Sequence, residues 1–220
     1  MQYARKLVYH SISCSVVRGG APYRLPMGYA IHKIVLASFC AGIFLGSKPE
    51  IDWFLYDMGR FFPEAYDRFV APISESQRDD LLDAYYSRLT SPSKSIAMEA
   101  ARAWASYENS CATLAAAHRD AGPMALSLAL LEAHYFKNNC FMPENHILDN
   151  LQSIKHLPAW IVQGRHDVIC PPHTAHKLAT RWGNNATLVL VDDAGHSAFE
   201  TGIVTQLMTS LKHITRRKDG

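Results

Sequence analysis

Apolar residues recur at three- and four-residue spacing through the middle of the chain, from residue 50 to residue 140. This spacing puts the apolar side chains on one face of a helix, so it predicts amphipathic helices. Prolines stand near the expected helix starts, where a missing N–H is tolerated. The predicted helices cover residues 50–62, 76–90, 95–117 and 123–139, and the prolines are Pro49, Pro72, Pro92 and Pro123.

After residue 158 the pattern changes to short β-branched runs that alternate with helical segments. It predicts strands over residues 159–164 and 186–193, and helices over residues 174–182 and 203–217. This strand-helix-strand-helix order is typical of parallel α/β structure. Parallel sheets are buried on both faces and usually have more than two strands. We therefore expect these units to be the last part of a larger fold.

The apolar stretch IVLASFCAGIFLG, residues 34–46, precedes the helical block. It is too short to span a bilayer, and it predicts a buried strand. Residues 1–33 have poor periodicity and are interrupted by glycines and prolines, so no element is predicted there. The predicted division is thus a degenerate segment over 1–33, a core strand over 34–46, a helical block over 47–150 and an α/β portion over 151–220.

The charges of the chain are nearly balanced, with 22 Lys and Arg against 20 Asp and Glu. Such a balance gives no strong field that would attract nucleic acid or an anionic membrane. We therefore expect neither of these partners, and a small or neutral ligand is favoured. The pattern gives no indication of an oligomeric state.

The cysteines are five in number, widely spaced and without a C-x-x-C pair. This usage favours neither a zinc site nor a disulfide framework, and it is typical of a reducing compartment. The first twenty residues lack the continuous apolar region of a signal peptide. We expect a cytoplasmic protein. The cysteines are Cys14, Cys40, Cys111, Cys140 and Cys170.

Asp167 and His196 each follow the end of a predicted strand, and a single predicted helix separates them. Functional groups of open α/β sheets gather in the loops at the carboxyl ends of the strands. If the two strands are neighbours, the two side chains can meet. An acid and then a histidine in this order form the second half of the α/β-hydrolase triad Ser, Asp or Glu, His. The carboxylate would orient the imidazole and stabilise its charged form.

Two other interpretations of these residues stay open. An aspartate after a strand often caps the next helix or turn, and a lone loop histidine is usually just exposed. A metal site is the second alternative, although the sequence has no H-E-x-x-H motif and no supporting cysteine pattern. Its candidate ligands are His166, Asp167, His173, His176 and His196.

The segments PAWIVQGRHDVICPP and VLVDDAGHSAFE together resemble the C-terminal signature of the prolyl aminopeptidases, also called proline iminopeptidases. The segments GIFLGSKPEIDWF, FFPEAYDRFVAPI, RLTSPSKSIAMEAARAWASYE and LLEAHYFKNN are similar to the helical cap of that family. The resemblance covers residues 27–204. It implies an α/β class with a partial α/β-hydrolase fold, in which a helical cap accompanies the last strand-helix units of a parallel sheet.

The resemblance also implies an activity, namely serine-type hydrolysis that releases an N-terminal proline from peptides. Asp167 and His196 match the catalytic acid and base of the family. The implied partners are peptides with an N-terminal proline, and no metal or organic cofactor is implied. The segment over residues 1–33 corresponds to a remnant of the region that carries the nucleophile.

Glu108 and Glu132 lie on apolar faces of predicted helices, among apolar residues three and four positions away. A buried carboxylate is costly unless a cation or several hydrogen bonds satisfy it. The pattern leaves open whether each pairs with an internal arginine such as Arg102, lies at a helix edge in water, or receives a substrate ammonium group. The resemblance implies the last role, because both residues match family positions that bind the free α-amino group of the substrate.

The chain lacks the nucleophile motif G-x-S-x-G that such a hydrolase needs. Gly19 and Gly20 match the family motif, but Ala21 stands in the position of the serine and Pro22 and Tyr23 replace the next two residues. Alanine cannot attack a carbonyl, and the proline removes an N–H that an oxyanion hole would use. The serines before the glycines, Ser11, Ser13 and Ser15, lack the context of the motif.

We therefore expect a truncated or frameshifted gene product that is inactive as it stands. The alternative is a non-catalytic remnant or a pseudo-enzyme that binds amines through the two glutamates. A different α/β-hydrolase activity, such as ester hydrolysis, is a further possibility, and in that case the glutamates would have no role. Ester substrates would then be cleaved whether or not their amine is acetylated.

Overall fold

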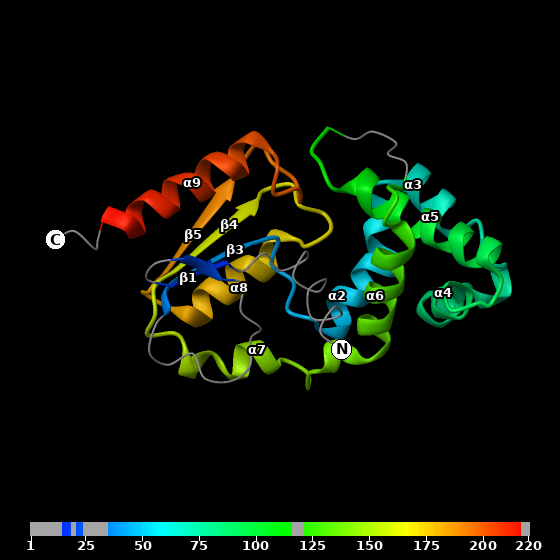
Figure 1. Cartoon of the computed structure of the whole chain (residues 1–220), viewed down its shortest axis with the longest axis horizontal. Helices are drawn as coiled ribbons and strands as arrows, with labels where there is room; N and C mark the ends of the chain where they lie inside the picture. The colour runs from blue at the N-terminus through cyan, green and yellow to red at the C-terminus, as the bar shows by residue number, and fades with distance from the viewer. Residues whose placement is uncertain (1–14, 19–20, 24–34, 116–120, 217–220) are drawn as a thin grey trace. The chain divides into compact units, whose positions relative to one another are not determined.

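The computed structural model describes residues 15–18, 21–23, 35–115 and 121–216 (Figure 1). Gly19, Gly20, Ser11 and Ser13 lie outside the described residues. The chain divides into two compact units. We call residues 1–45 with 145–220 the sheet unit and residues 46–144 the helical unit.

The sheet unit contains a five-stranded sheet with the strand order β2-β1-β3-β4-β5. The strands β3, β4 and β5 are parallel to one another, whereas β1 is antiparallel to both β2 and β3. The three parallel strands confirm the predicted α/β class. The strands are β1 (Ser15–Arg18), β2 (Ala21–Tyr23), β3 (Val35–Ala41), β4 (Ala159–Gly164) and β5 (Ala186–Val191).

The sheet is mixed, which the sequence pattern did not predict. The poor periodicity of residues 1–33 gives no prediction of elements there, and the structure has the two short strands β1 and β2 in this segment. Pro22 is compatible with β2 because this strand is at the edge of the sheet, where a missing N–H need not break a ladder bond. The predicted strand over 159–164 matches β4, and the one over 186–193 ends two residues early, at Val191.

Helices cover both faces of the parallel strands (Figure 1). Neighbouring residues of a strand point to opposite faces, and β4 shows this directly. Ile161 packs with residues of α8 (Pro172–Trp182), whereas Val162 packs with Ile203 of α9 (Thr201–Arg216). The two helices therefore lie on opposite faces and leave the carboxyl ends of the strands to the loops.

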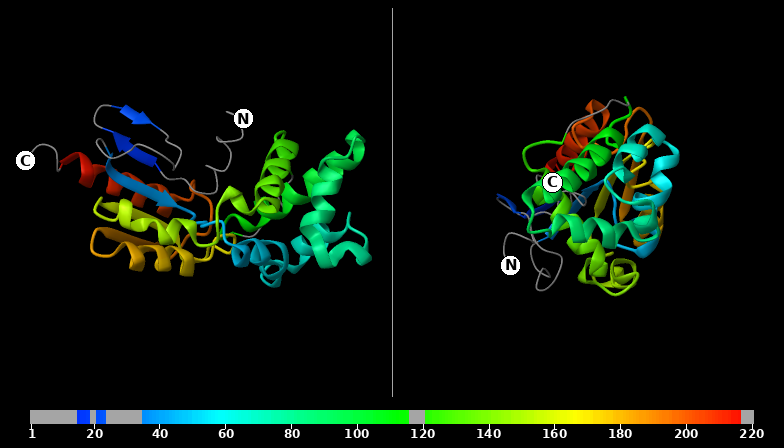
Figure 2. Two further views of the ribbon diagram at one scale, coloured as in Figure 1. Left: turned by 90° about the horizontal axis from the view of Figure 1, so that it is seen from below. Right: turned by 90° about the vertical axis from the view of Figure 1, so that its right-hand side faces the viewer.

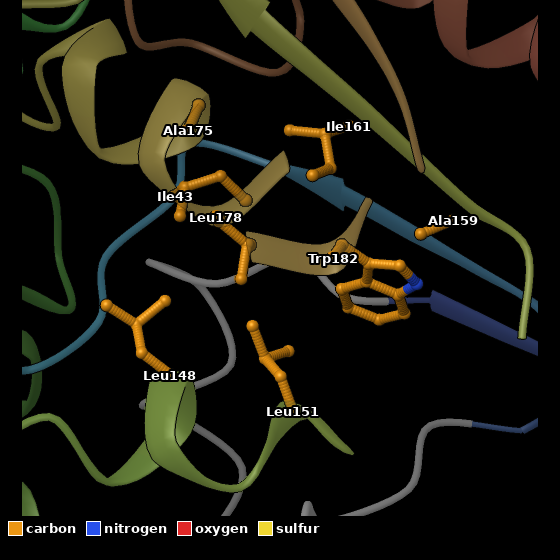
Figure 3. Packing of buried hydrophobic residues seen from close by; sticks show 8 residues of the cluster. All are labelled: Ile43, Leu148, Leu151, Ala159, Ile161, Ala175, Leu178 and Trp182. Atoms are coloured by element: carbon orange, nitrogen blue, oxygen red, sulfur yellow. The ribbon is translucent and has the colours of Figure 1, made fainter. Parts of the chain in front are cut away.

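The larger of these two apolar cores lies under α8 (Figure 3). The short helix α7 (His146–Asp149) and the 3₁₀ turn η5 (Leu151–Ser153) contribute leucines to it. The indole N–H of Trp182 donates to the carbonyl of Leu157 at 2.9 Å, so its one polar atom is satisfied. The core residues drawn in Figure 3 are Ile43, Leu148, Leu151, Ala159, Ile161, Ala175, Leu178 and Trp182.

The described part of the helical unit consists of helices and the loops that connect them, and it contains no strand (Figure 2). Its α-helices are α2 (Lys48–Asp52), α3 (Pro63–Val70), α4 (Leu81–Leu89), α5 (Lys94–Cys111) and α6 (Ala125–Lys137). Its other turns are the π-helical η1 (Trp53–Asp57) and the 3₁₀ turns η2 (Met58–Arg60), η3 (Glu75–Asp80) and η4 (Asn139–Phe141).

Aromatic rings fill the core of this unit. The ring of Phe69, from α3, stacks on Tyr85 of α4 at 4.6 Å and on Tyr107 of α5 at 4.5 Å between centroids. Trp104 of α5 is fully buried and contacts both Phe69 and Tyr85 edge-on. These contacts join three helices, so α5 packs at the centre of the unit through its aromatic face.

The predicted helices exist, but several of their boundaries differ. The helix predicted over 95–117 ends at Cys111, and the one predicted over 76–90 is a 3₁₀ turn until Asp80. The Asp80 carboxylate accepts the N–H of Asp83 at 3.0 Å, which caps α4 and explains its start at Leu81. The helix α3 was not among the predicted ones, because its eight residues are too short a window for a clear period.

Candidate functional site

The two loops that carry Asp167 and His196 follow adjacent parallel strands. The register pairs Gly164, the last residue of β4, with Val191, the last residue of β5. Two backbone hydrogen bonds extend this pairing into the loops, from Arg165 N to Val191 O at 2.9 Å and from His166 N to Ala194 O at 3.0 Å. The strands are therefore neighbours, which is the condition that the sequence argument required.

The structure brings Asp167 and His196 together. Nδ1 of His196 lies 3.1 Å from Oδ1 and 3.0 Å from Oδ2 of Asp167. Asp167 is 2% exposed, and the His196 side chain is 14% exposed. An imidazole whose Nδ1 hydrogen is bound by a carboxylate keeps Nε2 for proton exchange.

Gln163, in β4, fixes the Asp167 carboxylate. Its Nε2 donates to Oδ2 of Asp167 at 2.7 Å and to the carbonyl of Cys170 at 3.0 Å. Its Oε1 accepts the N–H of Ile43 at 3.1 Å. The N–H of Cys170 donates to Oδ1 of Asp167 at 2.8 Å, so both carboxylate oxygens have donors besides His196. Gln163 is fully buried with these bonds satisfied.

Gly164 allows the two loops to approach closely. A Cβ added at this residue would clash with the carbonyl of Gly195 and would stand 2.6 Å from the carbonyl of Ala194. Gly195 N in turn donates to the Glu200 carboxylate at 2.6 Å, which fixes the residue directly before His196. The strand end therefore needs glycine because the backbone of the histidine loop occupies the place of a side chain.

The environment of His196 favours its charged form. Burial lowers the pKa of His196, but the Asp167 carboxylate outweighs this effect, and the pKa lies well above the ordinary value of 6.5. The side chain of Cys170 acts in the same direction as Asp167. A histidine in this state gains a proton readily and is stabilised as imidazolium, as a general base must be during proton transfer.

The helical unit carries the two predicted glutamates on packed helices. Glu108 lies on α5 and Glu132 on α6, and both are half-buried. The indole N–H of Trp104 donates to Oε2 of Glu132 at 2.8 Å. Trp104 lies one turn before Glu108 on α5, so the two side chains are on the same face of that helix. This face therefore carries Glu108 and also the indole that donates to Glu132. Arg102, the arginine considered as a partner, makes no ion pair among the described residues.

The chain matches a known family over most of its length. The family described as "alpha/beta hydrolase fold" matches residues 30–203. The chain belongs to the alpha/beta hydrolase fold family. This confirms the predicted fold class, and the matched range agrees with the resemblance over residues 27–204.

The chain is also similar to proteins named as proline iminopeptidases. The chain is 42% identical over 178 residues to the "Proline iminopeptidase" of Arabidopsis thaliana, covering 77% of this chain and 46% of that protein. It is 37% identical over 185 residues to the "Probable proline iminopeptidase" of Leptolyngbya boryana, covering 80% of this chain and 57% of that one. A "Proline iminopeptidase" of Xylella fastidiosa is 38% identical over 167 residues, covering 72% of this chain and 53% of that protein. The chain spans about half the length of these relatives.

Ala21, the residue that the sequence resemblance places at the position of the nucleophile, lies in a strand. Ala21 is the first residue of β2, and Ser15 is the first residue of β1, which pairs with it in an antiparallel manner. A nucleophile of this fold class stands on a strand-to-helix turn. The described residues Ser15–Arg18 and Ala21–Tyr23 form an antiparallel pair of strands.

The metal alternative gains no support from the part of the chain that the structure describes. Within it, no group of three or more His, Cys, Asp and Glu side chains is arranged to hold a metal ion. His166, His173 and His176 are exposed, and the ring that hydrogen-bonds to the Asp167 carboxylate among the described residues is that of His196. No described helix combines the length and apolar character that crossing a membrane requires.

Two residues of this arrangement were missed by sequence reasoning. Gln163 could have been suspected, because a glutamine in an otherwise apolar strand needs buried partners. Trp104 gave no such signal, since a tryptophan on an apolar helix face is expected in any core. Its role as donor to Glu132 depends on how α5 and α6 pack.

Proposed function

We propose that this chain carries the acid–base pair and the amine receptor of a proline-specific aminopeptidase. The observation that carries the proposal is the Asp167–His196 pair, with Nδ1 within 3.1 Å of both carboxylate oxygens. Gln163 and the Cys170 N–H support that carboxylate. The substrate class, peptides with an N-terminal proline, is supported by the similarity to proline iminopeptidases.

In the proposed chemistry, His196 moves the protons. Its Nε2 would take the proton of an attacking serine hydroxyl while the oxygen bonds to the carbonyl carbon after the proline. The same proton would then pass to the leaving amine, and the C–N bond would break. Water would hydrolyse the acyl-enzyme in a second round of the same transfers. Asp167 would stabilise the imidazolium at both stages.

The glutamates Glu108 and Glu132 would recognise the substrate ammonium group. The free amine of an N-terminal proline is a secondary ammonium with two N–H donors, which suit carboxylate acceptors. The indole N–H of Trp104 donates to the Glu132 carboxylate at 2.8 Å and so orients it in the proposed receptor. Acetylation of the amine would remove both the charge and the donors.

The chain as it stands is proposed to lack turnover, because no G-x-S-x-G motif is present in its 220 residues. The test is hydrolysis of a chromogenic proline amide by the purified chain beside its His196→Ala variant. We expect no release of chromophore above the rate of the variant. Turnover that depends on His196 would show that another residue serves as nucleophile, and it would leave the acid–base role intact.

The amine receptor has its own test, an NMR titration of the full chain with prolinamide and with N-acetylprolinamide. We expect saturable binding of prolinamide only, and at least a tenfold loss in Glu132→Gln, because hydrogen bonds to charged groups contribute about 1.5–3 kcal/mol. Glu144→Gln is the matched control, since Glu144 is exposed on the same unit. Equal binding of both compounds would rule out the receptor.

A non-catalytic amine-binding protein is the second candidate function. It is favoured by one specific observation, that Ala21 lies in a strand where the family would have its serine. Binding of prolinamide without turnover would assign this function to the chain. Cleavage of acetylated and free-amine esters at equal rates would instead indicate an esterase in which the glutamates have no role.

A further inference from the structure

A half-open pocket of about 200 Å³ lies between α3 and α5 of the helical unit. Neither Glu108 nor Glu132 is among the residues that line it. A volume of this size suits a group of a few heavy atoms and is below that of pockets for drug-sized ligands. The lining residues are Ala65, Arg68, Arg102, Ala103, Ser106 and Tyr107.

Two arginines line this pocket, Arg68 from α3 and Arg102 from α5. Among the residues that the structure describes, neither Arg68 nor Arg102 makes an ion pair or a hydrogen bond through its guanidinium. Other arginines of the chain do have acidic partners, as Arg60 has Asp57. Two like charges that line one small pocket repel each other and are stabilised by an anion between them.

The acids nearest in sequence do not remove this charge. Glu99 precedes Arg102 by one helical turn, but its carboxylate binds Arg88 at 2.7 Å. Glu64 precedes Arg68 by one turn of α3, and these two residues form no ion pair. Arg68 and Arg102 are both exposed residues that line the pocket.

Tyr107 adds a buried hydroxyl that lacks a partner. The residue is 2% exposed and lines the pocket, and within the described part of the chain its hydroxyl makes no hydrogen bond. Buried polar atoms are nearly always hydrogen-bonded, so a buried hydroxyl without a partner indicates that a bound molecule could supply one. Burial raises the pKa of Tyr107 well above its ordinary value of 10.0, which keeps the hydroxyl protonated and able to donate.

We propose that this pocket binds a small oxyanion through Arg68, Arg102 and the hydroxyl of Tyr107. Guanidinium groups present paired N–H donors that match the oxygens of phosphate and carboxylate groups. A protonated phenol donates one more bond, and the Ser106 hydroxyl at the same wall is a further donor. The oxyanion could come from free phosphate or from the carboxylate of a peptide. The site is separate from the proposed peptidase chemistry and does not depend on it.

The test is a titration of the full-length chain with sodium phosphate at constant ionic strength, with chloride as the replaced ion. The arginine Nε–H signals report on the guanidiniums directly in ¹H–¹⁵N spectra. We expect saturable shifts in the unaltered chain, at least a tenfold weaker affinity in Arg68→Gln and Arg102→Gln, and a smaller loss in Tyr107→Phe. Arg60→Gln is the matched control, because this exposed arginine lies on the same unit and away from the pocket lining.

A second titration with glycylglycine and its C-terminal amide identifies the source of the oxyanion. Binding of phosphate alone, or of the free carboxylate but not the amide, supports the proposal and names the ligand group. Non-saturable shifts with every anion, or binding that Arg68→Gln and Arg102→Gln leave unchanged, would overturn it. Both arginines are exposed, so these variants are expected to fold, and cooperative urea unfolding checks this.

Discussion

At the residue scale, the acid–base pair is a small network of buried polar groups. Gln163 connects the N–H of Ile43, the Asp167 carboxylate and the carbonyl of Cys170. Each of these groups would be costly to bury alone, and together they are satisfied. The position of Asp167 is therefore determined by a residue that performs no chemistry itself.

The protonation of His196 predicts a pH-dependent stability. Its folded pKa is raised, so its contribution is complete below the ordinary value of 6.5 and is lost as the pH rises through the folded pKa. We expect the free energy of unfolding to fall more steeply from about pH 6 to about pH 9 in the unaltered chain than in His196→Gln. Urea unfolding at the two pH values measures this.

The control for this experiment is His173→Gln, because His173 is exposed on α8 and makes no ion pair among the described residues. This variant should keep the pH dependence of the unaltered chain. Identical slopes for the unaltered chain and His196→Gln would show that the Asp167 carboxylate does not raise the pKa of His196 in solution.

Gly164 provides the second prediction at this scale. Gly164→Ala should destabilise the chain by about 3 kcal/mol, because the added Cβ meets the backbone of Ala194 and Gly195, which cannot move without shifting the histidine loop. The measurement is the urea midpoint, together with the His196 pKa by NMR. The pKa should return toward its ordinary value as the distance to Asp167 grows.

Gly122→Ala is the matched control, since a Cβ at Gly122 meets no atom within 4 Å. Its stability should equal or slightly exceed that of the unaltered chain, because alanine restricts the unfolded state. If Gly164→Ala were as stable as this control, the close approach of the two loops would not exist in solution.

At the element scale, α5 and α6 form the part of the helical unit that carries the glutamates. Fully buried alanines stand on both helices, among them Ala101 of α5 and Ala129 of α6. Small side chains let the helix backbones approach closely, and this approach is what allows Trp104 to reach Glu132. The separation of the helices thus determines the hydrogen bonds of the receptor.

Enlarging one of these alanines should separate the helices. We expect Ala129→Leu to cost about 1–3 kcal/mol of unfolding free energy through overpacking. Binding of prolinamide should weaken along with it, because the Trp104–Glu132 bond would lengthen. Ser127→Leu places the same side chain on an exposed position of α6 and should change neither quantity. Equal stability of the two variants would contradict close packing of α6.

At the scale of the whole molecule, the chain has two units with separate cores. The sheet unit is discontinuous in sequence, with residues 46–144 inserted between its strands β3 and β4. The helical unit is continuous and has its own aromatic core around Phe69 and Trp104. A continuous segment with its own core has what independent folding requires.

We therefore expect a fragment of residues 46–144 to fold by itself. Far-UV circular dichroism should show a helical spectrum, and urea should unfold the fragment cooperatively. Phe69→Ala in the fragment should cost about 3–5 kcal/mol, because its ring is fully buried between Tyr85 and Tyr107. A non-cooperative loss of signal would show that the helical core depends on the rest of the chain.

The sequence alone determined the class of the fold and the order of most elements, and it placed Asp167 and His196 just after the ends of two successive strands. These follow from local signals, because the period of apolar residues selects helix or strand, and parallel strands bring their carboxyl ends to one edge. The start of α4 was less predictable. The helical spacing of apolar residues predicts a helix from residue 76, whereas the Asp80 carboxylate caps the helix and starts it at Leu81. The roles of Glu108 and Glu132 came from the family resemblance, and they remain predictions.

Only the tertiary structure decided which polar groups meet across long separations. Ile43 and Gln163 are 120 residues apart in sequence, and no local pattern encodes their hydrogen bond. The same holds for the bond from Trp104 to Glu132, for the pairing of β1 with β3 and for the pocket between Arg68 and Arg102. Such contacts depend on the packing of elements that are distant in sequence. Whether a buried polar atom has a hydrogen-bond partner is therefore decided only when the whole fold has formed.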